Sequence, residues 1–374
     1  MAQAQVCGIV MELNPLHKGH QYLFEEIKKR FNNPLIIVIT SGYFTMRGEV
    51  SLLSKKQKTE ELLKLGVDLI LELPTSYTLN SANLFAKYAV DGLKQAKIDY
   101  LCFGTEKLTN EDLLKLSEIS NSELFNQTLK KYLKENSLKT AYLKTYDELK
   151  IEQRLKDLAS MPNNTLALEY LRALENDHFM AFPRIGQFDN DFMLNNDSSF
   201  PSGSALRHAF NNKQRIAKYI PYQETKLKRI DLTVLNPLVQ SMTLRQDELK
   251  QKYQTNEGEI NYILKNLTPE LSYEDAIAKL TNKKYSSSKI RREILKLILN
   301  LEPQKFALRV LGFSQRGINH LKTIYAKINS SLNDLDQNYY HNEYNAAFLY
   351  SMLCKENIIK DEFIFPIKEQ SWKN

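Results

Sequence analysis

Short apolar runs that alternate with amphipathic helices fill the first 105 residues and constrain the fold more than any other feature. The predicted strands are residues 6–13, 34–40, 67–74 and 100–104, and the predicted helices between them are residues 20–30, 55–65 and 82–95. Nearly continuous apolar runs of this length are typical of strands buried on both faces of a sheet. Strands that are joined by helices pair in parallel, with right-handed crossovers. We therefore expect an α/β fold whose ligands bind beyond the carboxyl ends of the strands.

The first predicted strand ends in the string Leu13-Asn14-Pro15-Leu16-His17-Lys18-Gly19-His20. Proline fixes φ and donates no hydrogen bond, so Asn14-Pro15 ends the strand in a turn. Gly19 lacks a Cβ and permits a close approach between backbone and ligand. His17 and His20 are three residues apart at a helix start, so their rings share one face. Two imidazoles at a helix N-terminus suit a phosphate that gains charge in a transition state, which makes both histidines catalytic candidates.

Histidines at this spacing can also bind a metal ion. No third His, Cys or Asp follows at ligand spacing, so we expect no metal centre here. The order of strand, Asn-Pro turn, glycine and two histidines favours phosphate chemistry instead.

A second phosphate-binding pattern is Ser202-Gly203-Ser204-Ala205-Leu206-Arg207, which opens another predicted helix. The hydroxyls of Ser202 and Ser204 and the free N–H groups of the helix start can meet phosphate oxygens, and Arg207 can add charge. The alternative is an ordinary helix cap followed by a solvated arginine. Together with the two histidines, the pattern favours phosphate binding and makes Arg207 a third catalytic candidate.

Three further positions can contact a nucleotide. Gly104 follows the fourth strand, where an adenosine could lie against bare backbone, although a turn glycine is the alternative. Asn163 and Asn164 can hydrogen-bond a base or ribose, or cap a helix. Arg184 follows Pro183 just after a predicted strand at 179–182 and can pair with phosphate or remain on the surface.

The length of 374 residues suggests two domains, and we place the boundary near Pro221. Beyond it helical patterns dominate, with no strand expected before residues 363–365. The net charge of +7 permits nucleic-acid binding without requiring it. No signal peptide or membrane span is expected. Three dispersed cysteines, Cys7, Cys102 and Cys354, indicate free thiols in a reducing cytoplasm.

The densest basic cluster contains Lys283, Lys284, Lys289, Arg291 and Arg292, with Tyr285 among them. Such a cluster can bind an RNA backbone while the tyrosine stacks on a base, and a solvated helix face is the alternative. Residues 284–289 resemble the lysine loop of class I aminoacyl-tRNA synthetases, but they lie far along the chain from the predicted nucleotide site. We therefore expect no nucleotide role for them. The glycine patterns of dinucleotide-binding proteins and P-loop ATPases do not occur where those proteins carry them.

The strings described so far resemble those of the bacterial tRNA(Met) cytidine acetate ligases. The similarity covers nearly the whole chain: residues 8–20, 41–49, 71–74, 103–106, 162–166, 183–184, 202–207, 285–292 and 309–313. The resemblance implies a Rossmann-like nucleotidyltransferase domain at residues 1–220 and a mainly α-helical, tRNA-binding domain at residues 221–374. It also implies two steps. ATP and acetate give acetyl-adenylate, and the acetyl group then passes to the exocyclic amine of the wobble cytidine of elongator tRNA(Met).

The resemblance also implies a set of ATP contacts, with Mg²⁺ bound as the ATP complex. These contacts are Val10, Met11, Glu12, Leu13, Asn14, Pro15, Leu16, His17, Lys18, Gly19, His20, Gln21, Tyr22, Leu23, Gly104, Asn163 and Arg184. The sequence departs from the family pattern at Tyr43, Thr45 and Met46, where we expect Asn, Val and Gln, and at residues 54–56, where we expect Asp-Lys-Trp. Two alternatives share the same phosphate-facing residues: a small-molecule adenylyltransferase, and a nucleotide- or RNA-binding protein without turnover.

Overall fold

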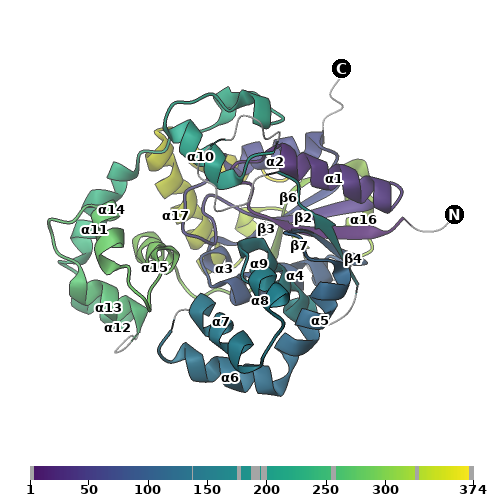
Figure 1. Cartoon of the computed structure of the whole chain (residues 1–374). Coiled ribbons are helices and arrows are strands. Elements are labelled where there is room, and N and C mark those ends of the chain that lie inside the picture. The colour runs from purple at the N-terminus through teal and green to yellow at the C-terminus, as the bar shows by residue number, and fades with distance from the viewer. Residues whose placement is uncertain are drawn as a thin grey trace.

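The structure is a computed structural model that describes residues 4–136, 138–174, 178–186, 194, 200–253, 258–324 and 328–369. Its centre is a sheet that has eight strands within these residues, with helices on both faces (Figure 1). The strand order is β5-β4-β1-β2-β3-β6-β7, and β8 pairs with β6. The strands are β1 (Val6–Met11), β2 (Leu35–Ser41), β3 (Leu69–Leu73), β4 (Tyr100–Thr105), β5 (Phe179–Pro183), β6 (Leu308–Phe313), β7 (Ile328–Asn329) and β8 (Ile367–Lys368).

Strands β1 to β5 pair in parallel, which confirms the predicted fold class. Alternate residues of β2 enter two different cores. Ile37 and Ile39 pack with α4 (Ala82–Gln95) and α9 (Pro162–Leu174). Ile36 and Val38 pack on the other face with α1 (Lys18–Arg30) and α2 (Lys55–Lys64). A strand that is buried on both faces has no polar face, which explains the continuous apolar run.

The chain reverses its direction across the sheet at β1. Strands β2 and β3 lie on one side of β1, whereas β4 and β5 lie on the other. In open parallel sheets, the carboxyl ends of the strands on either side of such a reversal border a ligand crevice. The ends of β1 and β4 are therefore the expected place for a site.

Helices that follow β4 form a layer beside α9 (Figure 1). They are α5 (Asn110–Asn121), α6 (Glu123–Leu133), α7 (Leu138–Glu148) and α8 (Gln153–Ala159). Helix α10 (Gly203–Asn211) and three short helices, η1 (Ala217–Tyr219), η2 (Glu224–Lys226) and η3 (Leu232–Val234), lead into the second part of the chain.

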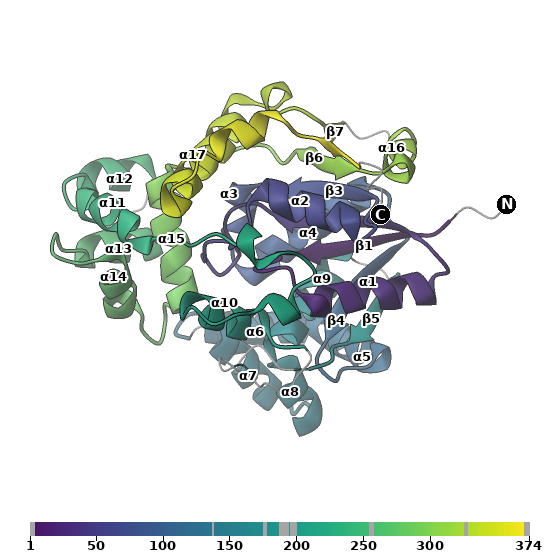
Figure 2. The same ribbon diagram turned by 90° about the horizontal axis from the view of Figure 1, so that it is seen from above.

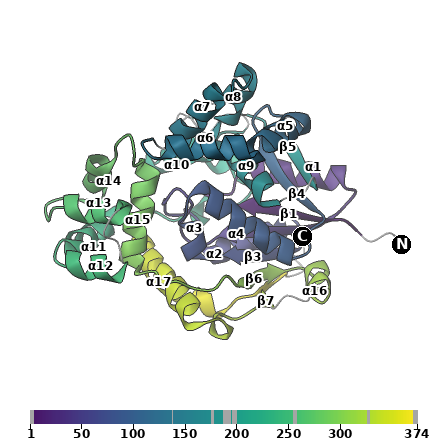
Figure 3. The same ribbon diagram turned by 90° about the horizontal axis from the view of Figure 1, so that it is seen from below.

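A group of helices with its own apolar core lies beside the sheet (Figure 3). It contains α11 (Leu235–Met242), α12 (Gln246–Lys252), α13 (Glu259–Asn266), α14 (Tyr273–Leu280), α15 (Ser287–Leu299) and α17 (Gln337–Cys354). Its core also takes in Tyr43, Phe44 and Val50 from the loop after β2, and Leu79 beside α3 (Thr75–Thr78). The loop after β2 thus joins the sheet to this helical group.

The prediction of no strand between residues 221 and 363 is wrong. β6 is antiparallel to β3 and extends the sheet, and Figure 2 shows β6, β7 and α17 along the edge of the sheet beyond β3. The prediction of a strand at residues 363–365 is also wrong, because Phe363 ends η5 (Ile359–Phe363) and β8 begins at Ile367. The remaining elements there are α16 (Gln315–Leu321) and η4 (Leu332–Asp334). Arg309 interrupts the apolar run of β6, and for this reason the sequence pattern did not predict the strand.

Fully buried charges hold these late elements to the sheet. Arg309 on β6 lies 3.3 Å from Glu72 on β3 and 2.6 Å from Glu362 of η5. Lys55 on α2 pairs with both of these carboxylates and, at 3.1 Å, with Glu343 on α17. Burial and the neighbouring acids raise the pKa of Glu343 to about 7, whereas the cations Lys55 and Arg309 hold the pKa of Glu72 at about 2. Removing one member would leave an uncompensated buried charge, which is strongly destabilising.

Cys7, Cys102 and Cys354 are buried free thiols, as predicted. Within the described residues, no helix has the length and apolar character that crossing a membrane requires.

Candidate active site

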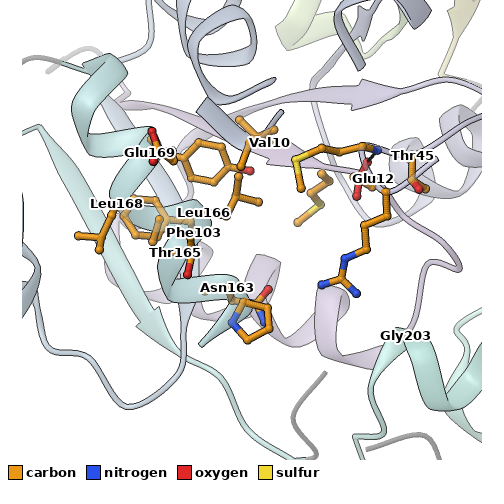
Figure 4. A pocket seen from close by; sticks show the side chains of 18 of the residues that line it. Val10, Glu12, Thr45, Phe103, Asn163, Thr165, Leu166, Leu168, Glu169 and Gly203 are labelled. Carbon is orange, nitrogen blue, oxygen red and sulfur yellow. Dashed lines mark hydrogen bonds between the residues drawn. The ribbon is translucent and has the colours of Figure 1, made fainter. Parts of the chain in front are cut away.

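A cavity of about 890 Å³ lies at the carboxyl ends of β1 and β4 (Figure 4). The segments that line it include the end of β1 with the start of α1, the turn at residues 45–49, the end of β4, α9, and the starts of α10 and α15. Val10 and Glu12 reach it from the β1 side, while Asn163, Leu166 and Glu169 reach it from α9 (Figure 4). The cavity is therefore at the crevice that the strand order predicts.

His17 and His20 lie at the start of α1, where each ring binds backbone. Nδ1 of His17 accepts from the N–H of Gly19, and Nδ1 of His20 accepts from the N–H of His17, both at 3.1 Å. The ring centroids are 3.9 Å apart. An accepting Nδ1 places the proton of the neutral ring on Nε2, so each neutral ring offers an N–H donor. Burial, His20, Arg184 and Arg207 hold the pKa of His17 well below its ordinary value.

Gly19 makes room for the ring of His17, whereas the sequence suggested that it makes room for a ligand. A Cβ at this position would lie 2.8 Å from Cε1 of His17, which is closer than real contacts allow. The glycine therefore leaves room for the His17 ring to bend back over the first turn of α1.

The start of α10 faces the start of α1. A Cβ on Gly203 would lie 3.9 Å from Nε2 of His17. Arg207 donates from Nη1 to the carbonyl of Asn14 at 2.6 Å and from Nη2 to Oγ of Ser204 at 3.1 Å. Two helix N-termini, two imidazoles and a guanidinium thus surround one region of the cavity. Such a region attracts an anion.

Ser202 and Ser204 have different positions. Ser202 is fully buried, its Oγ caps α10 by accepting from the N–H of Ala205 at 3.0 Å, and it does not line the cavity. Ser204 lines the cavity beside Arg207. The contribution of Ser202 is thus to start the helix.

The structure separates the implied ATP contacts into two groups. Leu16, Lys18 and Gln21 do not line the cavity. The remaining members do, and they are Val10, Met11, Glu12, Leu13, Asn14, Pro15, His17, Gly19, His20, Tyr22, Leu23, Gly104, Asn163 and Arg184.

The two adjacent asparagines at the start of α9 also differ. Asn164 is fully buried; its amide accepts from the N–H of Glu106 and donates to the carbonyls of Glu106 and Leu158, all at 2.8–2.9 Å. Asn163 lines the cavity and donates to Oε1 of Glu106 at 2.7 Å. Asn164 therefore supports the loop, and Asn163 faces the site.

A turn at residues 45–49 forms one wall of the cavity, and the sequence singled it out only through the family resemblance and its departures at Thr45 and Met46. The turn is closed by hydrogen bonds from the N–H of Thr45 to the carbonyl of Glu49 and from the N–H of Gly48 to the carbonyl of Thr45. Glu49 reaches Arg207, with 3.0 Å between Oε2 and Nη2. Gly48 has a φ of +69° and lies against α15, where a Cβ would be 2.7 Å from Cβ of Arg291. The turn therefore contacts both Arg207 and the helical group.

The expectation that residues 284–289 stand apart from the nucleotide site is wrong. Lys284, Ser286, Ser288, Lys289 and Arg292 line the same cavity as the histidines. Sequence separation misled the prediction, because the helical group folds back over the carboxyl ends of the strands.

The residues of the basic cluster differ in how exposed they are and in whether they line the cavity. Lys283 is exposed and outside the cavity, and Arg291 packs against Gly48. Arg292 is partly buried: its Nη1 donates to the carbonyl of Met46 at 3.1 Å, and its Nε is buried without a hydrogen-bond partner. Lys289 pairs with Glu259. The cluster therefore presents lysines at the cavity mouth and one arginine deeper inside.

The departures from the family pattern fall in two places. Thr45 and Met46 line the cavity. Tyr43 is buried, donates to Glu362 at 2.5 Å and stacks on Tyr350. Ser54 caps α2 by accepting from the N–H of Gln57, and Lys56 lies 3.7 Å from Asp361. Tyr43, Ser54 and Lys56 therefore lie outside the cavity.

No group of three or more His, Cys, Asp or Glu residues that could hold a metal ion lies within the part of the chain that the structure describes.

Comparisons with known proteins agree with this arrangement. The family described as HIGH Nucleotidyl Transferase matches residues 4–362. The tRNA(Met) cytidine acetate ligase of Caldicellulosiruptor saccharolyticus is 30% identical over 351 residues, which covers 87% of this chain and 86% of that protein. The protein of the same name from Staphylococcus saprophyticus is 30% identical over 369 residues, with 92% and 95% covered.

Two solved structures share the fold. The apo crystal structure of Thermotoga maritima TmcAL superposes with a TM-score of 0.81 at 21% identity, covering 97% of this chain and 99% of that chain. The form of that protein bound with α-thio ATP gives 0.79 at 22% identity, with the same coverage. These similarities confirm the nucleotidyltransferase-like α/β fold. The chain belongs to the HIGH nucleotidyl transferases and, among them, to the tRNA(Met) cytidine acetate ligase family.

Proposed function

We propose that this protein is an ATP-dependent ligase that activates acetate as acetyl-adenylate and acetylates the exocyclic amine of the wobble cytidine of elongator tRNA(Met). Family membership supports this proposal. The single observation that carries it is the meeting of the histidines of α1 with Arg207 of α10 in a cavity whose far wall is basic.

In the first step, an oxygen of acetate attacks the α-phosphorus of ATP, and the bond to the pyrophosphate oxygen breaks. A carboxylate is already ionised at neutral pH, so the attack needs no general base. The Nε2–H groups of His17 and His20 donate to phosphate oxygens as their charge grows, and Arg207 adds a fixed positive charge. The N-termini of α1 and α10 favour the same charge.

The nucleotide itself would lie across the ends of β1 and β4. Gly104 presents bare backbone there, and a Cβ on it would be 3.0 Å from Cγ of Arg184. Asn163 supplies an amide for the base or ribose, and Arg184 lies beside Gly104 for a phosphate. Mg²⁺ would enter as part of the ATP substrate, where it neutralises the phosphate oxygens.

We assign tRNA binding to the predicted second domain, residues 221–374, and above all to the start of α15. Lys284 and Lys289 flank the ring of Tyr285, with Nζ 5.4 Å and 5.2 Å from its centroid, and both line the cavity. Phosphate contacts there would position the RNA without reading its sequence. The target cytidine must leave its stack to enter the cavity. A tRNA substrate places the enzyme in the cytoplasm.

The test is mass analysis of tRNA nucleosides after incubation of the protein with ATP, labelled acetate and total tRNA. We expect one acetylated cytidine, found only in elongator tRNA(Met) and only when ATP is present. A dinucleotide product formed without RNA would identify a small-molecule adenylyltransferase instead. Absence of both products and of acetate-dependent pyrophosphate release would identify a binding protein without turnover.

A further inference from the structure

Glu12 lines the cavity, yet the adenylation step assigns its carboxylate no role. The residue directly follows β1, and its Oε1 accepts from the backbone N–H of Met46 at 2.5 Å. Its own carbonyl accepts from Nζ of Lys58 at 2.8 Å, and that buried amino group also donates to the carbonyls of Ser41 and Gly42. Backbone and side chain are both anchored, so the carboxylate is held at one point of the wall (Figure 4).

The carboxylate of Glu12 lies between the proposed phosphate site at Arg207 and the proposed entry route of the cytidine at α15. Arg207, on the phosphate side, donates to the carbonyl of Asn14, two residues after Glu12. On the other side, Arg292 of α15 donates to the carbonyl of Met46, whose N–H binds Glu12. An acetyl group on the α-phosphate and a cytidine arriving past α15 would therefore meet beside this carboxylate.

We propose that Glu12 is the general base of the transfer step, a role that rests on the proposed function. The cytidine N4 forms a bond to the acetyl carbonyl carbon, and the bond from that carbon to the phosphate oxygen breaks. AMP leaves with the electron pair of that bond. The proton that N4 loses passes to a carboxylate oxygen of Glu12 and from there to solvent. The N4 lone pair is delocalised into the ring, so proton removal during the attack lowers the barrier.

The surroundings of Glu12 suit a base. Burial raises its pKa from the ordinary value, while the hydrogen bond from Met46 and nearby cations oppose that rise. A carboxylate with a raised pKa is a stronger proton acceptor. The charged and titratable groups that face it are Arg47 and Glu49 of the turn, Lys58 of α2, Tyr170 of α9 and Arg292 of α15.

The experiment is single-turnover transfer from chemically prepared acetyl-adenylate to tRNA(Met), which bypasses ATP. Wild type, Glu12→Gln, Glu12→Asp and Glu61→Gln are compared from pH 5 to pH 8 with saturating reactants. Glu61 is a matched control because its carboxylate is also buried but lies on α2 outside the cavity, where it pairs with Lys64 at 2.8 Å.

We expect the wild-type rate to fall at acidic pH as Glu12 becomes protonated. Glu12→Gln should be about 100-fold slower or more and should lose that acidic limb. Glu12→Asp should be slow but retain the limb, and Glu61→Gln should follow the wild type. A Glu12→Gln rate equal to that of the wild type, or a slow rate with the acidic limb intact, overturns the role while the proposed function stands. No transfer by the wild type overturns both.

Discussion

Arg207 and Glu49 form an ion pair inside the candidate site, with 3.0 Å between Nη2 and Oε2. A phosphate that binds this guanidinium must compete with the carboxylate of Glu49. Glu49→Gln should therefore lower the KM for ATP in acetate-dependent ATP–pyrophosphate exchange. The two side chains are 18% and 28% exposed, so the pair is worth about 0.2–1 kcal/mol, or at most about a five-fold change. Glu26→Gln, which breaks the exposed Glu26–Lys29 pair on α1, is the control. A higher KM for ATP in Glu49→Gln would show that the carboxylate assists binding.

His20→Ala should slow acetyl-adenylate formation by about 100-fold or more, because one donor to the developing phosphate charge is lost. The rate is measured as acetate-dependent ATP–pyrophosphate exchange at saturating ATP. His208→Ala removes an exposed histidine of α10 whose ring contacts Asn212, the residue that caps the C-terminal end of this helix, and it should leave the rate unchanged. Wild-type exchange by a folded His20→Ala protein would contradict the catalytic assignment.

His17 should make the protein less stable as the pH falls. Its pKa is held well below 6.5 in the folded protein, mainly by burial. In the unfolded chain the ring protonates near its ordinary pKa, so below about pH 6.5 the unfolded state binds more protons. The free energy of unfolding therefore falls as pH drops from 6.5 toward the folded pKa. Denaturant titrations should show the wild type losing roughly 1–2 kcal/mol more than His17→Gln between pH 7 and pH 5. Equal losses would mean that His17 titrates alike in both states.

Asn163 and Asn164 should have opposite phenotypes when each is replaced with alanine. Asn164→Ala leaves the buried N–H and carbonyl groups of the 106 loop unpaired and should lower the free energy of unfolding by about 2–3 kcal/mol. Asn163→Ala should change stability little and weaken ATP binding by roughly ten-fold, the value of one or two hydrogen bonds. Calorimetric titration with ATP and thermal unfolding of both variants separate the two effects. Similar profiles for the two variants would contradict the assignment.

Lys284→Ala combined with Lys289→Ala should weaken tRNA binding and reduce its salt dependence by about one unit of slope per lost phosphate contact. Lys29→Ala with Lys87→Ala removes the same charge from helices α1 and α4, at positions outside the cavity. This control should bind tRNA normally in filter-binding assays across a salt series. Equal slopes for both double variants would show that the lysines at the cavity are not RNA contacts.

The parallel part of the sheet was predictable because burial on both faces produces apolar runs that stand out from the sequence. β6 was not, for two physical reasons. Arg309 breaks its apolar run, and only the carboxylates of Glu72 and Glu362 make that arginine tolerable in the core. Its pairing with β3 joins residues 237 apart in the chain, and no local pattern carries such information.

Those parts of the candidate site that depend on a few neighbouring residues in the sequence were predictable. His17, His20 and Arg207 lie at helix starts whose caps and turns are encoded within a few residues. The basic wall at α15 and the pairing of Glu49 with Arg207 depend on how the helical group docks. Gly48 is the one residue of the turn whose type reflects this docking, because a larger side chain would collide with α15. The sequence does not show that the residue across the contact is Arg291.

The late position of β6 has a consequence for synthesis of the chain. A ribosome releases residues 1–105, with β1 to β4, long before it translates residue 308. Until then the outer edge of β3 has no neighbour, and the acid Glu72 lacks the guanidinium of Arg309. An unpaired strand edge invites association with other chains. The nucleotide-binding half therefore completes its sheet only after nearly all of the protein has been made. A fragment that stops at residue 220 would lack β6, a strand of the same sheet.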